Sequence, residues 1–150
     1  MEIEEILERI DAKLKITKKE AEEDVIYIYC HRMPVGEKCR YCGKESYKIH
    51  SKYSREIMDL PIAEYKVKLK IEAKKYICEN TECSHKRFAE VLPFAQERSK
   101  RTRRLDDYIR EIGLKNSSVD AAEILRKTHA DISNKTVLRV IKKSGKRDKI

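Results

Sequence analysis

The sequence predicts an α+β fold, in which a small antiparallel sheet is followed by three helices and preceded by an N-terminal amphipathic helix. Apolar residues alternate with polar ones in the middle of the chain, and they recur at helical spacing near both ends. With 150 residues, 40% of them hydrophobic, the chain can form small modules but not a large enzyme domain. We therefore expect an N-terminal helix over 1–20, a sheet domain over 21–97 and a helical domain over 98–150.

Residues 1–20 have the spacing of one helix. The apolar positions are Ile3, Ile6, Leu7, Ile10 and Leu14. They fall on one face at about 3.6 residues per turn. A helix of this length is not stable alone, so we expect it to pack on the body of the protein, with pairing to a second copy as the alternative.

The middle of the chain has the period of strands. Residues 25–29 are β-branched and aromatic, and residues 65–72 alternate apolar and charged side chains. One or two further strands are expected within 46–60. The sequence Asp59-Leu60-Pro61 predicts a turn, because proline fixes its own φ and restricts the residue before it.

Three helices are expected from about Ser99. Leu105, Ile109 and Ile112 form the stripe of the first, which we expect to end at Gly113 as a left-handed cap. Ser117 can cap the second helix and Ser133 the third. Three short helices with a tight turn before the last one form a helix-turn-helix plan.

Positive charge is concentrated at the C-terminal end. The net charge is +9, and residues 98–150 carry 16 basic and 7 acidic side chains, whereas residues 1–30 carry 5 and 9. This distribution favours a polyanionic partner such as nucleic acid. The alternative is a solvated surface of the kind found in lysine- and glutamate-rich thermophilic proteins.

The sequence contains neither a membrane-spanning segment nor a signal peptide. No apolar run approaches the roughly 20 residues that span a bilayer, and the N-terminus is acidic and periodic, unlike a signal peptide. We therefore expect a cytoplasmic protein without a membrane partner or a small-molecule substrate. Five cysteines in a reducing compartment should be free or metal-bound.

Four of the cysteines form two pairs, Cys39-x2-Cys42 and Cys78-x4-Cys83. A two-residue gap lets both sulfurs of one turn face a metal ion about 2.3 Å away, and Gly43 suits the tight turn. The 35 residues between the pairs suffice for the predicted strands, so the sheet can bring the pairs together. The spacing predicts a zinc-ribbon-like domain with one structural zinc and no open coordination position.

Other residues could take part in or mimic such a site. His85 lies two residues beyond Cys83 and could replace it as a ligand. Cys30 lies in an apolar run, where core packing is the better interpretation. His31 and His50 are expected near the surface or behind the ligands.

The last predicted helix and the entrance to the first carry the candidate DNA contacts. Arginine and asparagine can bind base edges, and lysine mostly neutralises phosphate. The candidate residues are Arg101, Arg103, Arg104, Asn134, Lys135, Thr136, Leu138, Arg139, Lys142 and Lys143.

Several short motifs occur together in a fixed order. They are Cys39-x2-Cys42, His50-Ser51-x-Tyr53-x-Arg55, Asp59-Leu60-Pro61, Cys78-x4-Cys83, Phe88-Ala89-Glu90, Thr102-x-Arg104-Leu105 and Thr136-Val137-Leu138-Arg139. In this combination, residues 25 to 145 resemble the N-terminal part of ISL-three family insertion-sequence transposases. Many relatives have Cys-Pro where this chain has Cys39-Arg40.

The resemblance implies a function. It implies that Cys39, Cys42, Cys78 and Cys83 ligate zinc, and that the helices bind the terminal inverted repeats of a mobile element as double-stranded DNA. The family's DDE catalytic domain would follow the helices, and since the sequence ends at Ile150 we expect a DNA-binding module that is not an enzyme.

Two alternatives remain from the sequence. One is an RNA-binding zinc-ribbon protein, although the sequence shows no segment of glycines and aromatic residues on which the bases of a single strand could stack. The other is a truncated transposase that acts as a regulator or inhibitor, by occupying DNA or by pairing through residues 1–20 with itself or with a full-length transposase.

Overall fold

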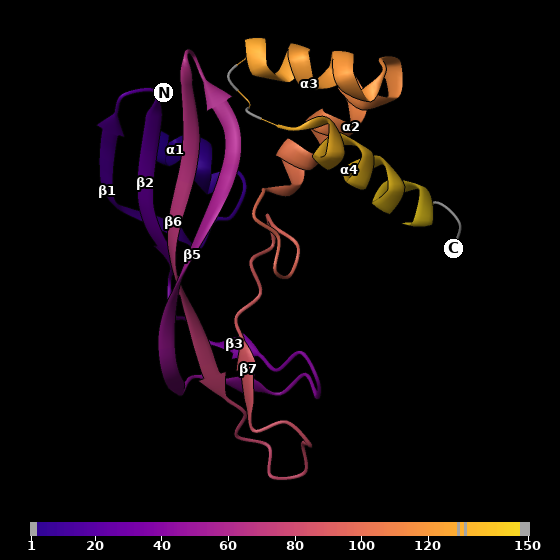
Figure 1. Ribbon diagram of the computed structural model, residues 1–150. Helices are drawn as coiled ribbons and strands as arrows, with labels where there is room; N and C mark the ends of the chain where they lie inside the picture. Colours follow the sequence, from indigo (N-terminus) through magenta and orange to yellow (C-terminus); the bar gives the residue numbers. More distant parts are fainter. Residues whose placement is uncertain (1–2, 129, 131, 148–150) are drawn as a thin grey trace. The chain divides into compact units, whose positions relative to one another are not determined.

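The computed structural model describes residues 3–128, 130 and 132–147, and it has an α+β fold with a mostly antiparallel sheet (Figure 1). The elements in chain order are α1 (Ile3–Glu8), β1 (Leu14–Glu22), β2 (Val25–Arg32), β3 (Glu37–Lys38), β4 (Glu45–Ser46), β5 (Ile49–Ile62), β6 (Tyr65–Ile77), β7 (Arg87–Ala89), α2 (Arg103–Lys115), α3 (Ser118–Lys127) and α4 (Asn134–Arg147).

The chain divides into two compact units. The first, here called the cysteine unit, contains the described part of Met1–Lys19, Ile28–Glu56 and Leu69–Pro93. The second, the helix unit, contains Glu20–Tyr27, Ile57–Lys68 and the described part of Phe94–Ile150. Residues 57–68 thus belong with helices that lie far along the chain, a pairing that the sequence did not predict.

The larger sheet has the strand order β1-β2-β6-β5, and β7 pairs with β6 (Figure 1). In β6 the alternation predicted for residues 65–72 is confirmed, since Val67, Leu69 and Ile71 are buried and the intervening side chains are more exposed. In β2, Ile28 and Cys30 are buried in the same alternating manner. One face of these strands therefore forms a core, as period-2 patterning requires.

The turn between β5 and β6 lies later than expected. Asp59, Leu60 and Pro61 are all within β5, and Ala63, with a φ of 53°, begins the turn. The predicted turn at Asp59-Leu60-Pro61 is wrong. β5 is an edge strand, so the missing N–H of Pro61 need not cost a ladder hydrogen bond.

The prediction of one helix over residues 1–20 is also wrong beyond Glu8. α1 ends at Glu8, and residues 14–22 form β1. Asp11 accepts hydrogen bonds from the Lys13 backbone N–H at 3.1 Å and from Arg32 Nε at 2.6 Å, which stabilise a turn where the helix would have continued. Pairing with β2 overrides the helical spacing. Leu7 and Leu14 are nevertheless buried within the chain.

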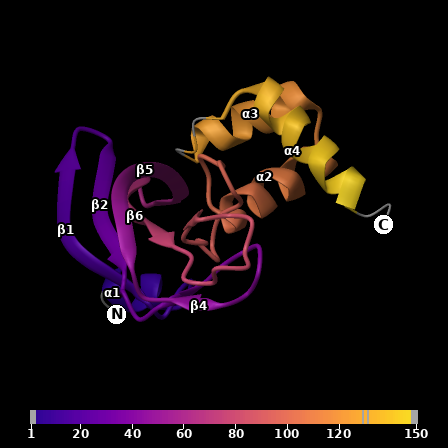
Figure 2. The same ribbon diagram turned by 90° about the horizontal axis from the view of Figure 1, so that it is seen from below.

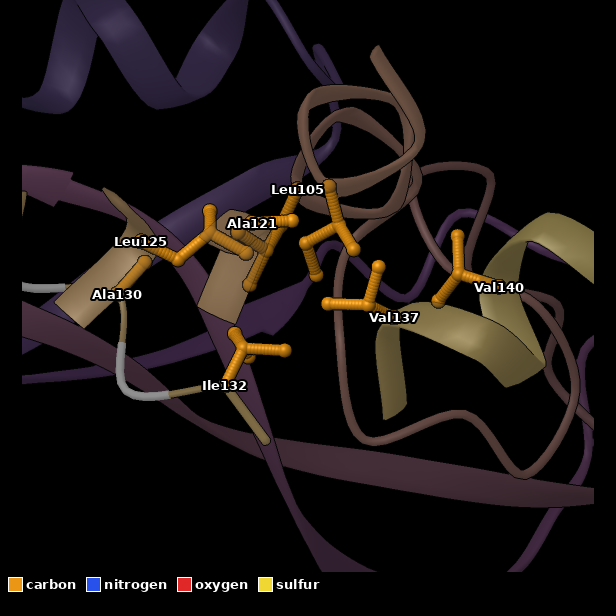
Figure 3. Packing of buried hydrophobic residues seen from close by; sticks show 8 residues of the cluster. Leu105, Ala121, Leu125, Ala130, Ile132, Val137 and Val140 are labelled. Carbon is orange, nitrogen blue, oxygen red and sulfur yellow. The ribbon is translucent and has the colours of Figure 1, made fainter. Parts of the chain in front are cut away.

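The three helices α2, α3 and α4 lie together (Figure 2), and their apolar side chains form one buried cluster. Figure 3 shows side chains of all three helices pointing toward one another, among them Leu105, Leu125 and Val137. The predicted cap of α3 is confirmed, because Ser117 Oγ accepts from Asp120 N at 3.1 Å. Ser133 Oγ likewise accepts from Thr136 N at 3.2 Å in the first turn of α4.

Gly113 lies inside α2 and does not end it. The helix continues to Lys115 with Asn116 as its cap, so the prediction of a glycine cap is wrong. A β-carbon at Gly113 would lie 2.8 Å from Ile141 Cδ1 and 2.8 Å from Val137 Cγ1. Glycine is therefore needed for the close approach of α4.

Candidate metal centre and nucleic-acid interface

The first cysteine pair lies in the tight loop between β3 and β4. These strands pair with Glu37 opposite Ser46 and Lys38 opposite Glu45. The loop is held by two backbone hydrogen bonds, from Cys39 N to Lys44 O at 2.9 Å and from Gly43 N to Cys39 O at 2.8 Å. Gly43 has a φ of 79°, which a residue with a β-carbon rarely adopts.

The second cysteine pair lies between β6 and β7. Cys78 N donates to Lys86 O at 2.9 Å and continues the strand pairing into the loop. Asn80 shapes the turn, because its carbonyl accepts from Cys83 N at 3.1 Å and its side chain accepts from Glu82 N at 3.1 Å. The sheet therefore presents both sulfurs of this pair from one turn.

The four sulfur atoms lie within 4.8 Å of one another. Cys39 Sγ lies 4.0 Å from Cys83 Sγ, and Cys42 Sγ lies 3.6 Å from Cys78 Sγ. These distances are far too long for disulfides, whose sulfurs are about 2.05 Å apart. They match the edge of a tetrahedron of about 3.8 Å that follows from zinc–sulfur bonds of about 2.3 Å. Cys39, Cys42, Cys78 and Cys83 form a site for one structural zinc ion, as predicted.

The ligand sulfurs differ in their protonation: the pKa of Cys42 is lowered, whereas burial and the neighbouring sulfurs raise the pKa of Cys78 to about 12 and also raise that of Cys83. A hydrogen bond with the backbone of Lys44 and another with the side chain of Asn80 lower the pKa of Cys42 to about 6. Deprotonation to the thiolate that zinc binds is therefore easier at Cys42 than at Cys78. When bound, zinc would tie the two loops together.

The alternative residues lie outside this group of sulfurs. The His85 ring stacks on Tyr41 with 3.5 Å between ring centroids, and its Nδ1 lies 3.0 Å from Ser84 Oγ. Cys30 is buried in β2, where desolvation raises the pKa of its thiol to about 12. His50 is exposed and lies beside Ser51. Cys83, not His85, completes the four-sulfur group.

Comparison with known families agrees with this geometry. The model for the zinc-finger of transposase IS204/IS1001/IS1096/IS1165 matches residues 36–83, a segment that contains all four cysteines. This segment is similar to a transposase zinc ribbon. The match confirms the resemblance to the N-terminal region of ISL-three family transposases. No curated protein and no solved structure matches the chain. None of the described helices is long and apolar enough to cross a membrane.

The predicted contacts on α4 occupy one face of that helix. Val137 and Val140 are buried, and Ile141 is partly buried against the same cluster. Thr136 is half-buried, and its hydroxyl lies 3.1 Å from Ser133 Oγ. The other predicted residues of α4 are exposed: Asn134, Lys135, Leu138, Arg139, Lys142 and Lys143. The helical domain expected over 98–150 ends in residues 148–150, which lie outside the described residues.

The three arginines at the start of α2 differ in their surroundings. Arg103 is exposed. Arg101 Nε donates to Asp106 at 2.6 Å. Arg104 donates to both carboxylate oxygens of the buried Asp59, with 2.7 Å between its Nε and Oδ1.

Asp59 is a structural residue that sequence reasoning missed. Its Oδ1 also accepts from the hydroxyl of Thr102 at 2.8 Å, and that hydroxyl caps α2 by accepting from Leu105 N at 3.3 Å. No local pattern marks Asp59, because its partners lie 43 and 45 residues later. The motifs Asp59-Leu60-Pro61 and Thr102-x-Arg104 are thus two halves of one contact.

A basic groove in the helix unit was also missed. It has a volume of about 530 Å³ and lies between the loop 96–101, α2 and α4. Arg98, Lys100 and Arg110 line it together with the predicted Arg101, Arg139, Lys142 and Lys143. The positive charge of residues 98–150 was the only sequence signal of this groove.

Proposed function

We propose that this chain is a DNA-binding module of the insertion-sequence transposase type. In this proposal α3 and α4 form a helix-turn-helix, and α4 enters the major groove of double-stranded DNA. The observation that carries the proposal is the difference between the two faces of α4. The outer face is basic and exposed, and the opposite face is packed in the apolar cluster. A helix fixed in this way can present Asn134 and Arg139 to base edges without moving.

The proposal assigns separate roles to the parts of the chain. The cysteine unit is held by one zinc ion, and residues 98–150 with their basic end form the DNA-binding domain. The match to a transposase zinc finger supports the terminal inverted repeats of a mobile element as the target. The role of this chain is DNA recognition in the cytoplasm, and strand cleavage and joining are not assigned to it.

Selection from a random duplex library tests this function most directly. Zinc-loaded protein should enrich one sequence at about 0.15 M salt. Arg139→Gln should relax the preference at one base pair and cost about 1–3 kcal/mol of binding free energy. Lys115→Gln, an exposed position ion-paired with Glu111, is the matched control and should leave the selected sequence unchanged. Failure to enrich any duplex, or stronger competition by single-stranded or structured RNA, would overturn the proposal.

A further inference from the structure

The groove between the loop 96–101, α2 and α4 has a strongly biased lining. Seven basic side chains line it, and Asp106 and Asp107 are the two acidic ones. The cations come from three separate elements: the loop supplies Arg98, Lys100 and Arg101, α2 supplies Arg110, and α4 supplies Arg139, Lys142 and Lys143. Cations spread in this way suit a row of anionic groups better than one small anion.

The loop that supplies three of these cations is held in one conformation. Ser99 N donates to Gln96 O at 3.0 Å, and Ser99 Oγ donates to Arg101 O and accepts from Arg101 N. Arg98 is in the left-handed region with a φ of 62°. A non-glycine residue stays in that region only where its surroundings determine the backbone.

The same loop is attached to the end of β5. Met58 N donates to Lys100 O at 2.8 Å, and Thr102 N donates to Met58 O at 2.9 Å. The buried carboxylate of Asp59 then binds Thr102 and Arg104 at the start of α2. Arg104 is thereby a positioning residue for the loop, because its guanidinium is held by Asp59. Less conformational entropy is lost when a ligand binds a loop that is already ordered.

Most of the lining cations are available to an anion. Arg101 is paired with Asp106, whereas Arg98, Lys100, Arg110 and Arg139 form no ion pair with any residue that the structure describes. Arg139 belongs both to this groove and to the exposed face of α4. The groove is therefore continuous with the face assigned to base contacts.

We propose that this groove binds consecutive phosphates of one DNA strand, beside the major groove that α4 enters. The inference rests on the proposed function and adds Arg98, Lys100 and Arg110 as backbone contacts. Duplex DNA carries one negative charge per about 1.7 Å of its axis, so a row of cations meets a row of phosphates. These contacts fix the position of the protein on DNA and carry no sequence information.

The variant Arg98→Gln/Lys100→Gln tests the phosphate contacts of the groove. Both side chains are exposed and the loop is held mainly by backbone and Ser99 contacts, so the variant should fold and keep its zinc. Affinity is measured by fluorescence anisotropy between about 0.05 and 0.2 M salt, for the selected duplex and for a scrambled one. We expect a loss of about tenfold that is the same for both duplexes, and a salt slope smaller by about 1.8.

The control is Lys115→Gln/Lys127→Gln, which removes the same charge from exposed positions of the helix unit outside the groove. Its salt slope should remain that of the wild type. Arg110→Gln, on α2, provides an independent arm and should lower the slope by about 0.9.

The outcomes separate the two proposals. If wild-type protein binds a selected duplex and the groove variants keep its salt slope and affinity, the phosphate-binding role of the groove is wrong and the DNA-binding function stands. If the groove variant loses affinity only for the selected duplex, these residues read sequence and the phosphate assignment is wrong. If the wild type binds no duplex at all, both proposals are overturned.

Discussion

The metal centre and the three-helix region are stabilised in different ways. Around the four sulfurs the strands other than β6 are very short, with two residues in each of β3 and β4 and three in β7. The buried cluster there consists of Cys39, Tyr76, Cys78 and Phe88, and two of these are ligands. Strand pairs of this length are not stable alone, so the bonds to zinc must supply the missing free energy.

The helix region has an apolar core of its own. Eight residues from α2, α3, α4 and the segment before α4 are buried in one cluster. Met58 and Leu60 of β5 pack against it. Burial of large aliphatic side chains contributes about 1.5–3 kcal/mol each, so this region has a source of stability that needs no metal. The comparison shows that one chain can be stabilised by a metal in the region where its apolar core is small, and by side-chain packing in the region where the core is larger.

Removal of a zinc ligand should have the largest effect. Cys39→Ser or Cys78→Ser should lose the zinc and unfold the ribbon, because apparent binding free energies of structural zinc reach roughly 10–16 kcal/mol. Zinc stoichiometry and thermal unfolding measure this, and the helical circular dichroism signal should fall much less. Cys30→Ser is the control and should keep one zinc, since Cys30 lies outside the four-sulfur group. If both ligand variants keep metal and melting temperature, the ribbon interpretation is wrong.

Truncation in the helix core should have an intermediate effect. Leu105 is fully buried, so Leu105→Ala should lower the free energy of unfolding by about 2–5 kcal/mol and leave the zinc content unchanged. Urea denaturation followed at 222 nm measures the loss. Leu114→Ala, on the same helix but exposed, should change stability by less than about 0.5 kcal/mol. Equal losses in the two variants would contradict the proposed core.

Loss of the Asp59 charge should have the smallest effect of the three. Asn in Asp59→Asn can still accept from Thr102 but pairs less strongly with Arg104, whose side chain is about a third exposed. We expect a loss of about 1–3 kcal/mol in the free energy of unfolding, measured by thermal denaturation. Glu64→Gln, in the exposed turn between β5 and β6, is the matched control. Unchanged stability in Asp59→Asn would show that the contact does not hold the start of α2.

The sequence by itself determined the features that depend on local spacing. The two cysteine pairs, the alternation in β6 and the serine cap of α3 are each encoded within a few residues, and all were predicted correctly. Zinc geometry and strand periodicity constrain these spacings directly.

Tertiary structure decided the features that depend on distant partners. The apolar spacing up to Leu14 predicts a helix over residues 1–20, yet pairing with β2 and the Asp11–Arg32 contact make residues 14–22 a strand. The local sequence predicts that Gly113 caps a helix, yet glycine is required there because Val137 and Ile141 of α4 approach it closely. The groove needs a loop, α2 and α4 together. None of these contacts has a local signature, because the free energy that selects them comes from groups far apart in the chain.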